Sequence, residues 1–248
     1  MAELAFPGAP CARASSGAVA GRCAICAARP FSICAALPDA DLARLEALAE
    51  TLALARGQVL FREGDPAAQV YNVSAGSVRL SRLTPDGRRQ ILGFAFAGDF
   101  LGLDRRAEHL CTAEALEAAT VCRFSRPRFE ALLAERRDLE QALAGRAADA
   151  LAAAQGQMLR LGHKTALERL ASFLLTLPGC DPARPSAPGQ VRLPMTRQEI
   201  ADYLGLTLET VSRGFSRLKR DGLIRQVSLA EVVVERPAAL LAAAGEAA

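Results

Sequence analysis

The sequence predicts an α+β fold made of a β-roll or jelly roll, a long helix and a helix-turn-helix near the C-terminus. Three observations indicate these parts. Glycines recur about every ten residues from 57 to 102, apolar residues repeat at helical spacing over 127–161, and residues 196–224 read as two short helices joined at a glycine. With 248 residues, half of them apolar, the chain is long enough for one large or two small domains.

The composition restricts the class of protein. A net charge of +3 is too small to indicate a nucleic-acid partner by itself, so any basic surface must be local. No apolar run of about 18 residues occurs, and residues 1–22 have neither a basic start nor an apolar core. We therefore expect a flexible tail over 1–22, no membrane association and a cytoplasmic location. In that reducing compartment, closely spaced cysteines favour metal or redox chemistry over disulfides.

Residues 56–125 carry the pattern of short strands separated by turns. The stretches GQVLFREGD, QVYNVSAGSVRLSRL and RQILGFAFAGDF place β-branched and aromatic residues between glycine, aspartate and proline. The run TPDG at 84–87 predicts a turn, since proline presets φ and glycine accepts positive φ. Before these strands, Asp39 is the predicted N-cap of a short helix with leucines at a spacing of three.

The long helix has an apolar seam that is typical of a short coiled coil. Its members are spaced 4, 4, 3, 4, 4 and 3 residues apart, and the alanines in its middle would let two backbones approach closely. The seam consists of Leu139, Leu143, Ala147, Ala150, Ala154, Met158 and Leu161. We predict that Leu143 to Leu161 form the interface of a homodimer. The alternative is a helix that lies on its own domain.

Residues 196–224 follow the plan of a helix-turn-helix. Thr196 and Glu199 form a capping box that opens the first helix, and Gly205 makes the sharp turn that ends it. Thr207 caps the second helix. The residues predicted to point inward are Ile200, Leu204, Val211, Phe215 and Leu218.

The outward face of the second helix is polar and basic. It bears Glu209, Ser212, Arg213, Arg217, Lys219 and Arg220. Over residues 205–226 five basic residues outnumber two acidic ones, so the local net charge of +3 equals that of the whole chain. One alternative is an ordinary solvated helix. Because the first turns of such a helix reach base edges in the major groove, we expect this face to bind double-stranded DNA.

The chemistry of these side chains suggests two roles. Arg213 can donate two hydrogen bonds to guanine, Glu209 can accept one from cytosine, and the hydroxyl of Ser212 suits several bases. The basic side chains further along, from Arg217 to Arg220, are expected to bind phosphates, which fixes the register without reading the sequence.

Three cysteines fall within the stretch CAICAARPFSIC at 23–34. Cys23, Cys26 and Cys34 are spaced C-x2-C-x7-C, a stronger sign of a metal site than a single C-x-x-C. A fourth cysteine from the β-roll would complete a set of thiolates that suits zinc or a 4Fe–4S cluster. We expect His109 on the surface or in a loop. A β-roll metalloenzyme would need several histidines as metal ligands, and the two distant histidines of this chain cannot form such a set. We therefore predict that the chain is not an enzyme.

Three further stretches complete a family pattern. GDFLGLD, ALEAATVC and LGLTLETVSRGFSRLKRDGLI, with the long helix and the cysteines, resemble the CRP/FNR family of bacterial transcription regulators over residues 23–236. The resemblance implies a flexible tail at 1–22, a cluster-binding segment with a cyclic-nucleotide-binding-like β-roll sensor domain at 23–135, a dimerisation helix at 136–163 and a winged helix at 164–240. The helix carrying Glu209, Ser212 and Arg213 is similar to the FNR-like oxygen-sensing branch.

That branch implies a function. Its members bind inverted repeats of the TTGAT…ATCAA type as homodimers, and RNA polymerase is an expected partner of an activator of this kind. By the resemblance, Cys23, Cys26, Cys34 and Cys122 hold a 4Fe–4S cluster, with Cys111 as the rival for the fourth position. The alternatives that stay open are a zinc staple, thiol oxidation and nitric oxide sensed through haem.

Cyclic nucleotide binding is not expected. In the branch that binds cyclic AMP, the β-roll carries an Arg-Ser/Thr-Ala phosphate signature. Here Cys111 stands where that arginine should lie, before Thr112 and Ala113. Cys11 and Cys180 are expected to take no part in the site.

Overall fold

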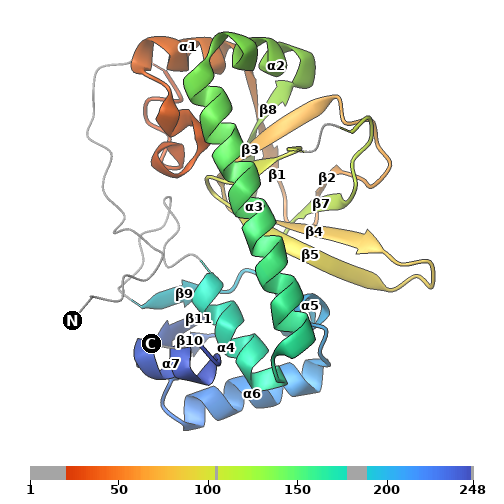
Figure 1. Ribbon diagram of the computed structural model, residues 1–248, viewed down its shortest axis with the longest axis vertical. Coiled ribbons are helices and arrows are strands. Elements are labelled where there is room, and N and C mark those ends of the chain that lie inside the picture. Colours follow the sequence, from red (N-terminus) through yellow and green to blue (C-terminus); the bar gives the residue numbers. More distant parts are fainter. Residues whose placement is uncertain (1–20, 104–105, 178–188, 247–248) are drawn as a thin grey trace. The chain divides into compact units, whose positions relative to one another are not determined.

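The structure is a computed structural model that describes residues 21–103, 106–177 and 189–246 (Figure 1). Most of the tail predicted at 1–22, together with Cys11 and Cys180, therefore lies outside the described residues. Contacts group the described chain into one unit over 21–152 and a second over 153–246. The division falls within the long helix α3 (Arg137–His163).

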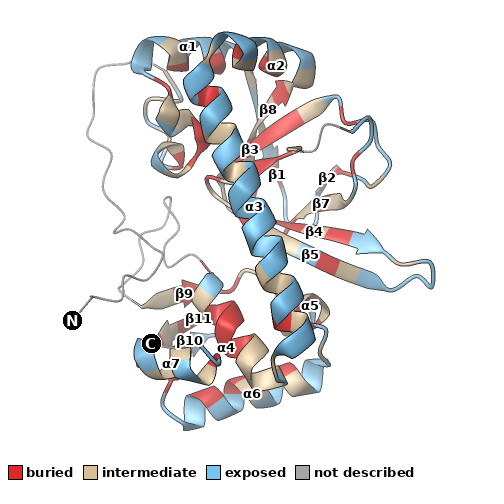
Figure 2. Ribbon diagram, viewed as in Figure 1, coloured by how far each residue is buried: buried red, intermediate tan, exposed pale blue. Residues whose placement is uncertain are grey.

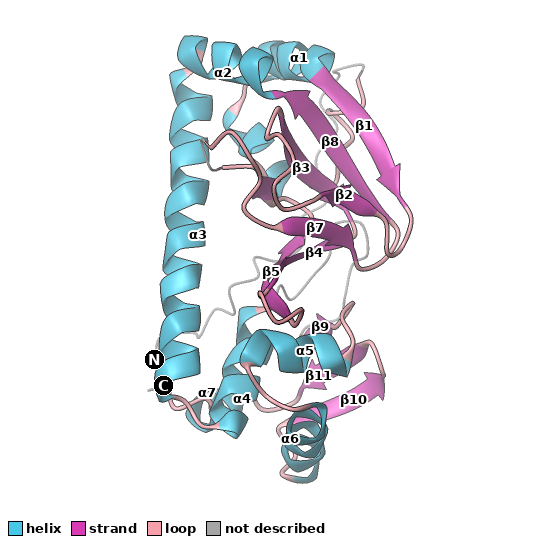
Figure 3. Ribbon diagram, turned by 90° about the vertical axis from the view of Figure 1, so that its right-hand side faces the viewer, coloured by secondary structure: helices cyan, strands magenta, loops and turns pink. Residues whose placement is uncertain are grey.

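The first unit is built on two antiparallel four-stranded sheets. One has the order β1 (Ala49–Leu54), β8 (Ala119–Ser125), β3 (Gln69–Ala75) and β6 (Phe100–Leu101). The other has the order β2 (Val59–Phe61), β7 (Thr112–Ala115), β4 (Ser77–Leu83) and β5 (Arg89–Phe96). Figure 3 shows these strands in magenta, with α1 (Asp39–Leu48) and α2 (Arg126–Glu135) at one end of them. The predicted β-roll is confirmed.

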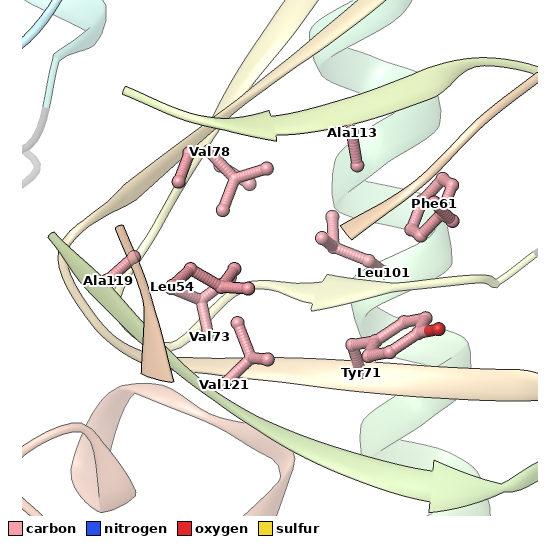
Figure 4. Close-up of a cluster of buried hydrophobic side chains, with 11 residues drawn as sticks. Leu54, Phe61, Tyr71, Val73, Val78, Leu101, Ala113, Ala119 and Val121 are labelled. Atoms are coloured by element: carbon pink, nitrogen blue, oxygen red, sulfur yellow. The ribbon is translucent and has the colours of Figure 1, made fainter. Parts of the chain in front are cut away.

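Apolar side chains fill the inside of the roll (Figure 4). This inner core contains Leu54, Phe61, Tyr71, Val73, Val78, Ala95, Leu101, Ala113, Ala115, Ala119 and Val121. His109 is also buried, and its ring stacks on Phe61 with the centroids 3.8 Å apart. Of the two predicted places for His109, the loop is right and the surface is wrong, because the loop folds inward at this residue.

A second core lies on the other face of the first sheet. This outer core contains Ile33, Leu37, Leu45, Val70, Phe100, Phe124, Phe129, Leu132 and Leu139. The strand β8 serves both cores because successive side chains of a strand point to opposite faces. Val121 packs in the inner core, whereas Cys122 packs against the outer core. This alternation presents Cys122 to the segment that precedes α1.

The segment before α1 contains the short 3-10 helices η1 (Arg29–Phe31) and η2 (Ile33–Ala36). The prediction that Asp39 is the N-cap of α1 is wrong, because Pro38 takes that position with extended backbone and Asp39 is the first helical residue. Its carboxylate stays useful in the first turn, where negative charge suits the helix N-terminus. It also accepts a hydrogen bond of 2.8 Å from Arg29.

The helical region predicted over 127–161 is two helices that meet at Arg136, α2 and α3. Leu139, in the first turn of α3, is fully buried in the outer core. The first turn of α3 therefore packs on its own domain, which is the alternative to a dimer seam given above.

The second unit has the predicted helix-turn-helix. Its elements are α4 (Ala166–Thr176), β9 (Gln190–Arg192), α5 (Arg197–Leu204), α6 (Leu208–Arg220), β10 (Ile224–Ser228), β11 (Glu231–Val234) and α7 (Pro237–Ala243). The strands form an antiparallel sheet in the order β10, β11, β9, which supplies the wing. Thr196 and Glu199 make the predicted capping box, and Gly205 ends α5 with φ of 61°. Among the described helices, none has both the length and the apolar character needed to cross a membrane.

Candidate functional site

The outward face of α6 is held in place by what α6 buries on the other side. The side chain of Thr207 caps the helix by accepting a hydrogen bond of 3.2 Å from the backbone N–H of Thr210. The stripe of Val211, Phe215 and Leu218 is buried, as predicted. All six residues of the predicted DNA-binding face are consequently exposed, namely Glu209, Ser212, Arg213, Arg217, Lys219 and Arg220.

Three arginines of this face form ion pairs with nearby carboxylates in the free chain. Arg213 donates to a carboxylate oxygen of Glu209 at 2.6 Å, and both side chains are more than two-thirds exposed. Arg217 and Arg220 share Asp221, at 3.7 and 3.5 Å. The pairs orient the arginines along the helix, and because they are exposed they contribute little to stability.

Arg197 is a basic residue of this unit that sequence reasoning missed. It follows the capping Thr196 at the start of α5, and its guanidinium lies over the ring of Phe215, 3.2 Å from the centroid. Two of its nitrogens, Nη1 and Nη2, are buried and find no hydrogen-bond partner among the described residues. Burial lowers the pKa of Arg197 to about 10. Its place directly after the capping Thr196 was the feature of the sequence that could have drawn attention to it.

The cysteines lie on two different parts of the first unit. Cys23, Cys26 and Cys34 belong to the segment over 21–36, which we call the cysteine segment. Cys122 lies on β8, where its neighbours across the sheet are Thr51 of β1 and Asn72 of β3. Cys34 and Cys122 both pack against the outer core, and Cys111 packs against the inner core. All five are half-buried free thiols.

Four of these thiols act on one another electrostatically. Burial is the main reason that the pKa of Cys23 rises to about 12, with further increases from Glu46 and from the charges of Cys34, Cys122 and Cys26. Burial likewise raises the pKa of Cys122 to about 11, helped by Cys26 and Cys34. The pKa of Cys34 is also raised, first by burial. Cys23, Cys26, Cys34 and Cys122 thus influence one another through their charges.

Two side chains fix the backbone at the first and third cysteines of the cysteine segment. The carboxylate of Glu46, on α1, accepts hydrogen bonds from the backbone N–H groups of Arg22 at 2.8 Å and Cys23 at 3.3 Å. The hydroxyl of Ser32 caps η2 by accepting from the backbone N–H of Cys34 at 3.2 Å. The first and third predicted ligands are thus anchored independently of any bound group.

The four thiols do not converge on one point. Within the described ranges, no set of three or more cysteine, histidine, aspartate or glutamate side chains is arranged to hold a single metal ion. The donor set is nevertheless the right one for soft metal chemistry, because thiolate sulfur is the ligand of zinc and of iron–sulfur clusters. The thiols would lose their protons on binding such a group.

The predicted dimer seam is largely solvent-exposed in the single chain, and the middle of α3 is pale blue in Figure 2. Ala147, Ala150 and Ala154 are exposed, and Met158 is 73% exposed. Leu143 and Leu161 at the ends are partly buried. The prediction missed Leu151, which is 61% exposed and stands seven residues before Met158 on the same face.

Family models match two parts of the chain. Residues 51–136 match the "Cyclic nucleotide-binding domain" and residues 168–243 match the "Crp-like helix-turn-helix domain". These ranges coincide with the β-roll and with the DNA-binding unit.

Relatives match nearly the whole chain. A nitrogen fixation regulation protein FixK of Bradyrhizobium diazoefficiens is 43% identical over 82% of this chain and 85% of its own length. The transcriptional activator protein FnrL of Cereibacter sphaeroides is 38% identical over 91% and 92%. The fumarate and nitrate reduction regulatory protein of Salmonella typhi is 33% identical over 94% of each chain.

A solved structure agrees with these relatives. FixK2 of Bradyrhizobium japonicum superposes with a TM-score of 0.73 at 36% identity, covering 81% of this chain and 98% of that one. The relatives are regulators of transcription, which confirms the expectation that this chain is not an enzyme. The chain therefore belongs to the CRP/FNR family of DNA-binding transcription regulators.

Proposed function

We propose that the chain is an oxygen-responsive regulator in which a 4Fe–4S cluster on Cys23, Cys26, Cys34 and Cys122 controls dimerisation and DNA binding. The observation that carries this proposal is that Cys34 of the cysteine segment and Cys122 of β8 pack against the same outer core. The raised pKa values of Cys23 and Cys122, to which the charges of the other thiols contribute, agree with this. A group that binds all four ties the segment to the roll. When bound, the cluster supplies an iron–sulfide core that oxygen can destroy.

The arrangement of the described thiols argues against a preformed site for a single zinc ion. A single zinc ion needs four ligand atoms within about 2.3 Å of one point, and the described residues form no set of that kind. A cube of four irons and four sulfides is wider than one ion, so its cysteines stand further apart. The raised pKa values of Cys23 and Cys122 also argue against simple thiol oxidation, because the thiolate is the reactive form.

The homodimer is supported by the exposed apolar residues of α3. Leu151 and Met158 are large side chains left in water in the single chain, with small alanines between and beside them. Packing two such helices would bury these side chains at close approach. The alanines contribute little area, so the dimer is marginal and responds to whatever orders the first unit.

DNA recognition follows from pairing two α6 helices in one dimer. Two recognition helices about one DNA turn apart would read an inverted repeat such as TTGAT…ATCAA. Arg213 and Glu209 would exchange their mutual ion pair for guanine and cytosine edges, with Ser212 beside them. Arg217, Lys219 and Arg220 would bind phosphates. A single chain loses the second contact and with it the avidity.

Cyclic nucleotide binding is not part of the proposal, although the matched family model carries that name. The inside of the roll is filled by Phe61, Tyr71 and Leu101 with their neighbours (Figure 4). Cys111 packs there in the position where the family's phosphate-binding arginine is expected.

We further propose a partner and a location, from the relatives and from an exposed loop of the roll. FnrL is named a transcriptional activator, and we propose the same role here, with RNA polymerase as partner. The β4–β5 loop and the start of β5, residues 84–90, expose Asp86, Arg88 and Arg89 and are a candidate contact. Because a bacterial regulator acts where the chromosome lies, we propose the cytoplasm as its location.

The test compares two single cysteine variants of protein purified without air. Wild-type protein and Cys111→Ser should carry about four iron atoms per chain with a broad visible absorption band, whereas Cys122→Ser should not. The same samples are titrated with a TTGAT…ATCAA duplex and with a scrambled duplex, before and after exposure to air. Colourless, iron-free wild-type protein that binds the operator equally well in both conditions contradicts the oxygen switch.

A further inference from the structure

One side chain of α3 reaches the cysteine segment directly. The guanidinium of Arg146 donates a hydrogen bond from Nη2 to the backbone carbonyl of Phe31. Phe31 ends η1 and stands three residues before Cys34. In Figure 1 the red segment that precedes α1 accordingly lies beside α3. Arg146 is also the immediate neighbour in sequence of Ala147, a member of the exposed seam.

The acceptor carbonyl is pressed against a turn of the roll. Gly98 has a φ of +103°, and a Cβ added there would lie 2.6 Å from the carbonyl oxygen of Phe31. Only glycine leaves this space open. The next residue, Asp99, accepts a hydrogen bond of 2.8 Å from the backbone N–H of Phe96, so the turn is itself fixed.

Asp99 places a negative charge near the same guanidinium. Burial raises the pKa of this carboxyl, and the positive charge of Arg146 acts in the opposite direction. Arg146 therefore binds a backbone carbonyl of the cysteine segment, and its positive charge also acts on a carboxyl of the roll. Hydrogen bonds from charged donors are among the stronger ones in proteins.

A short run of residues and hydrogen bonds connects Cys34 to α3. Ser32 follows Phe31, donates to the carbonyl of Arg29 at 3.1 Å and accepts from the backbone N–H of Cys34. A displacement of Cys34 would be expected to move Ser32 and the Phe31 carbonyl with it. Arg146 is the residue of α3 that would register this displacement.

We propose that Arg146 is the positioning residue that transmits the state of the cysteine segment to α3, an inference that rests on the proposed function. While Cys34 is bound together with Cys122, the Phe31 carbonyl stays against Gly98 and holds Arg146. The turn of α3 that carries Ala147 is then fixed on the roll and presents the seam. When the segment is released, Arg146 loses its acceptor and this turn loses its anchor.

The test measures the ratio of operator affinities with and without the cluster for three variants. Arg146→Ala should bind iron like the wild type, but the ratio should fall by about tenfold, the value of one charge-assisted hydrogen bond. Arg146→Lys keeps a donor and should recover part of the ratio. Arg137→Ala removes an exposed arginine of the same helix and should keep the wild-type ratio. An unchanged ratio in iron-loaded Arg146→Ala overturns the proposal.

A second measurement needs no metal. In metal-free protein, a maleimide should label Cys34 several-fold faster in Arg146→Ala than in the wild type, with Cys111 as the internal reference. Equal labelling overturns the contact, and this arm also decides the proposal if Arg146→Ala takes up no iron. If the wild type takes up no iron, the proposed function and the regulatory role fail together, whereas labelling still reports separately on the contact.

Discussion

Arg213 and Glu209 lie one turn apart on α6 and form an ion pair of 2.6 Å on the exposed face of that helix. The pair joins the two side chains that best suit a guanine and a cytosine edge. If the two side chains read bases as proposed, binding to DNA has to break or share their ion pair. Substitutions at single residues of this helix can therefore measure what each side chain contributes to DNA affinity.

Arg213→Ala should remove discrimination at one base pair, by about 1–3 kcal/mol, because a bidentate contact to guanine is lost. Lys219→Ala should instead weaken binding to all sequences alike and lower the salt slope of the affinity by about 1. Fluorescence anisotropy with single-base operator variants at several salt concentrations measures both. Equal effects of the two substitutions would contradict the division into base and phosphate contacts.

Leu151→Glu should weaken the dimer by about 1.5–3 kcal/mol, because it removes a leucine from the seam and places a charge there. Leu159 is the matched control, since it is the same residue type on the same helix and is 62% exposed against 61% for Leu151, but points away from the seam. Sedimentation of the cluster-loaded protein gives the dimer affinity. If Leu159→Glu dissociates the dimer and Leu151→Glu does not, the seam has been assigned to the wrong face.

Gly98→Ala should destabilise the first unit more than Gly57→Ala. Both glycines have positive φ, so both substitutions carry a backbone cost of about 1 kcal/mol. Only Gly98 adds a collision, because its new methyl would meet the Phe31 carbonyl at 2.6 Å, whereas nothing lies within 4 Å at Gly57. Thermal unfolding compares the two variants. Equal melting temperatures would mean that the cysteine segment is not seated on this turn.

The thiols predict how the stability of the metal-free protein depends on pH. Cys23 and Cys122 have pKa values of about 12 and 11 in the folded chain, against 9.0 for an ordinary thiol. The folded state therefore keeps protons that the unfolded state has lost above pH 9. Their contribution is fully present below pH 9 and is lost as the pH rises through 11 and 12.

Denaturant titrations between pH 8 and 10.5 measure this dependence. The wild type should lose free energy of unfolding faster than a variant with both residues changed to serine, at up to about 1.4 kcal/mol per pH unit for each thiol. Parallel slopes for the two proteins would show that the thiols are not buried together. Because a cluster binds thiolates, its uptake from iron and sulfide should also improve from pH 7 to pH 8.

The sequence predicts elements well where local chemistry decides them. The capping box of Thr196 with Glu199 and the left-handed Gly205 mark α5 without any tertiary information, and both are present. The N-cap of α1 was mistaken because Pro38 and Asp39 both suit the start of a helix. The sequence pattern alone does not decide which of two adjacent residues takes the N-cap position.

The remaining features depend on contacts between distant segments. The burial of His109 against Phe61 is set by how the loop folds over the roll. The place of Leu139 in the outer core is set by helices packed on the first sheet, although its spacing matches the seam. The contact between Arg146 and Phe31 joins residues more than one hundred positions apart. Periodicity along one element carries no information about such pairs.

The strand β8 turns Val121 toward one core and Cys122 toward the other. A shift of its pairing by one residue would exchange them, bringing a thiol into the inside of the roll and taking the fourth sulfur from the cysteine segment. An inserted or deleted residue in this strand would thus disturb the packing of both cores and, if the proposed cluster site is right, would also remove its fourth ligand. Variants that alter the threshold of response are accordingly expected in the loops and in the cysteine segment, and not in the length of β8.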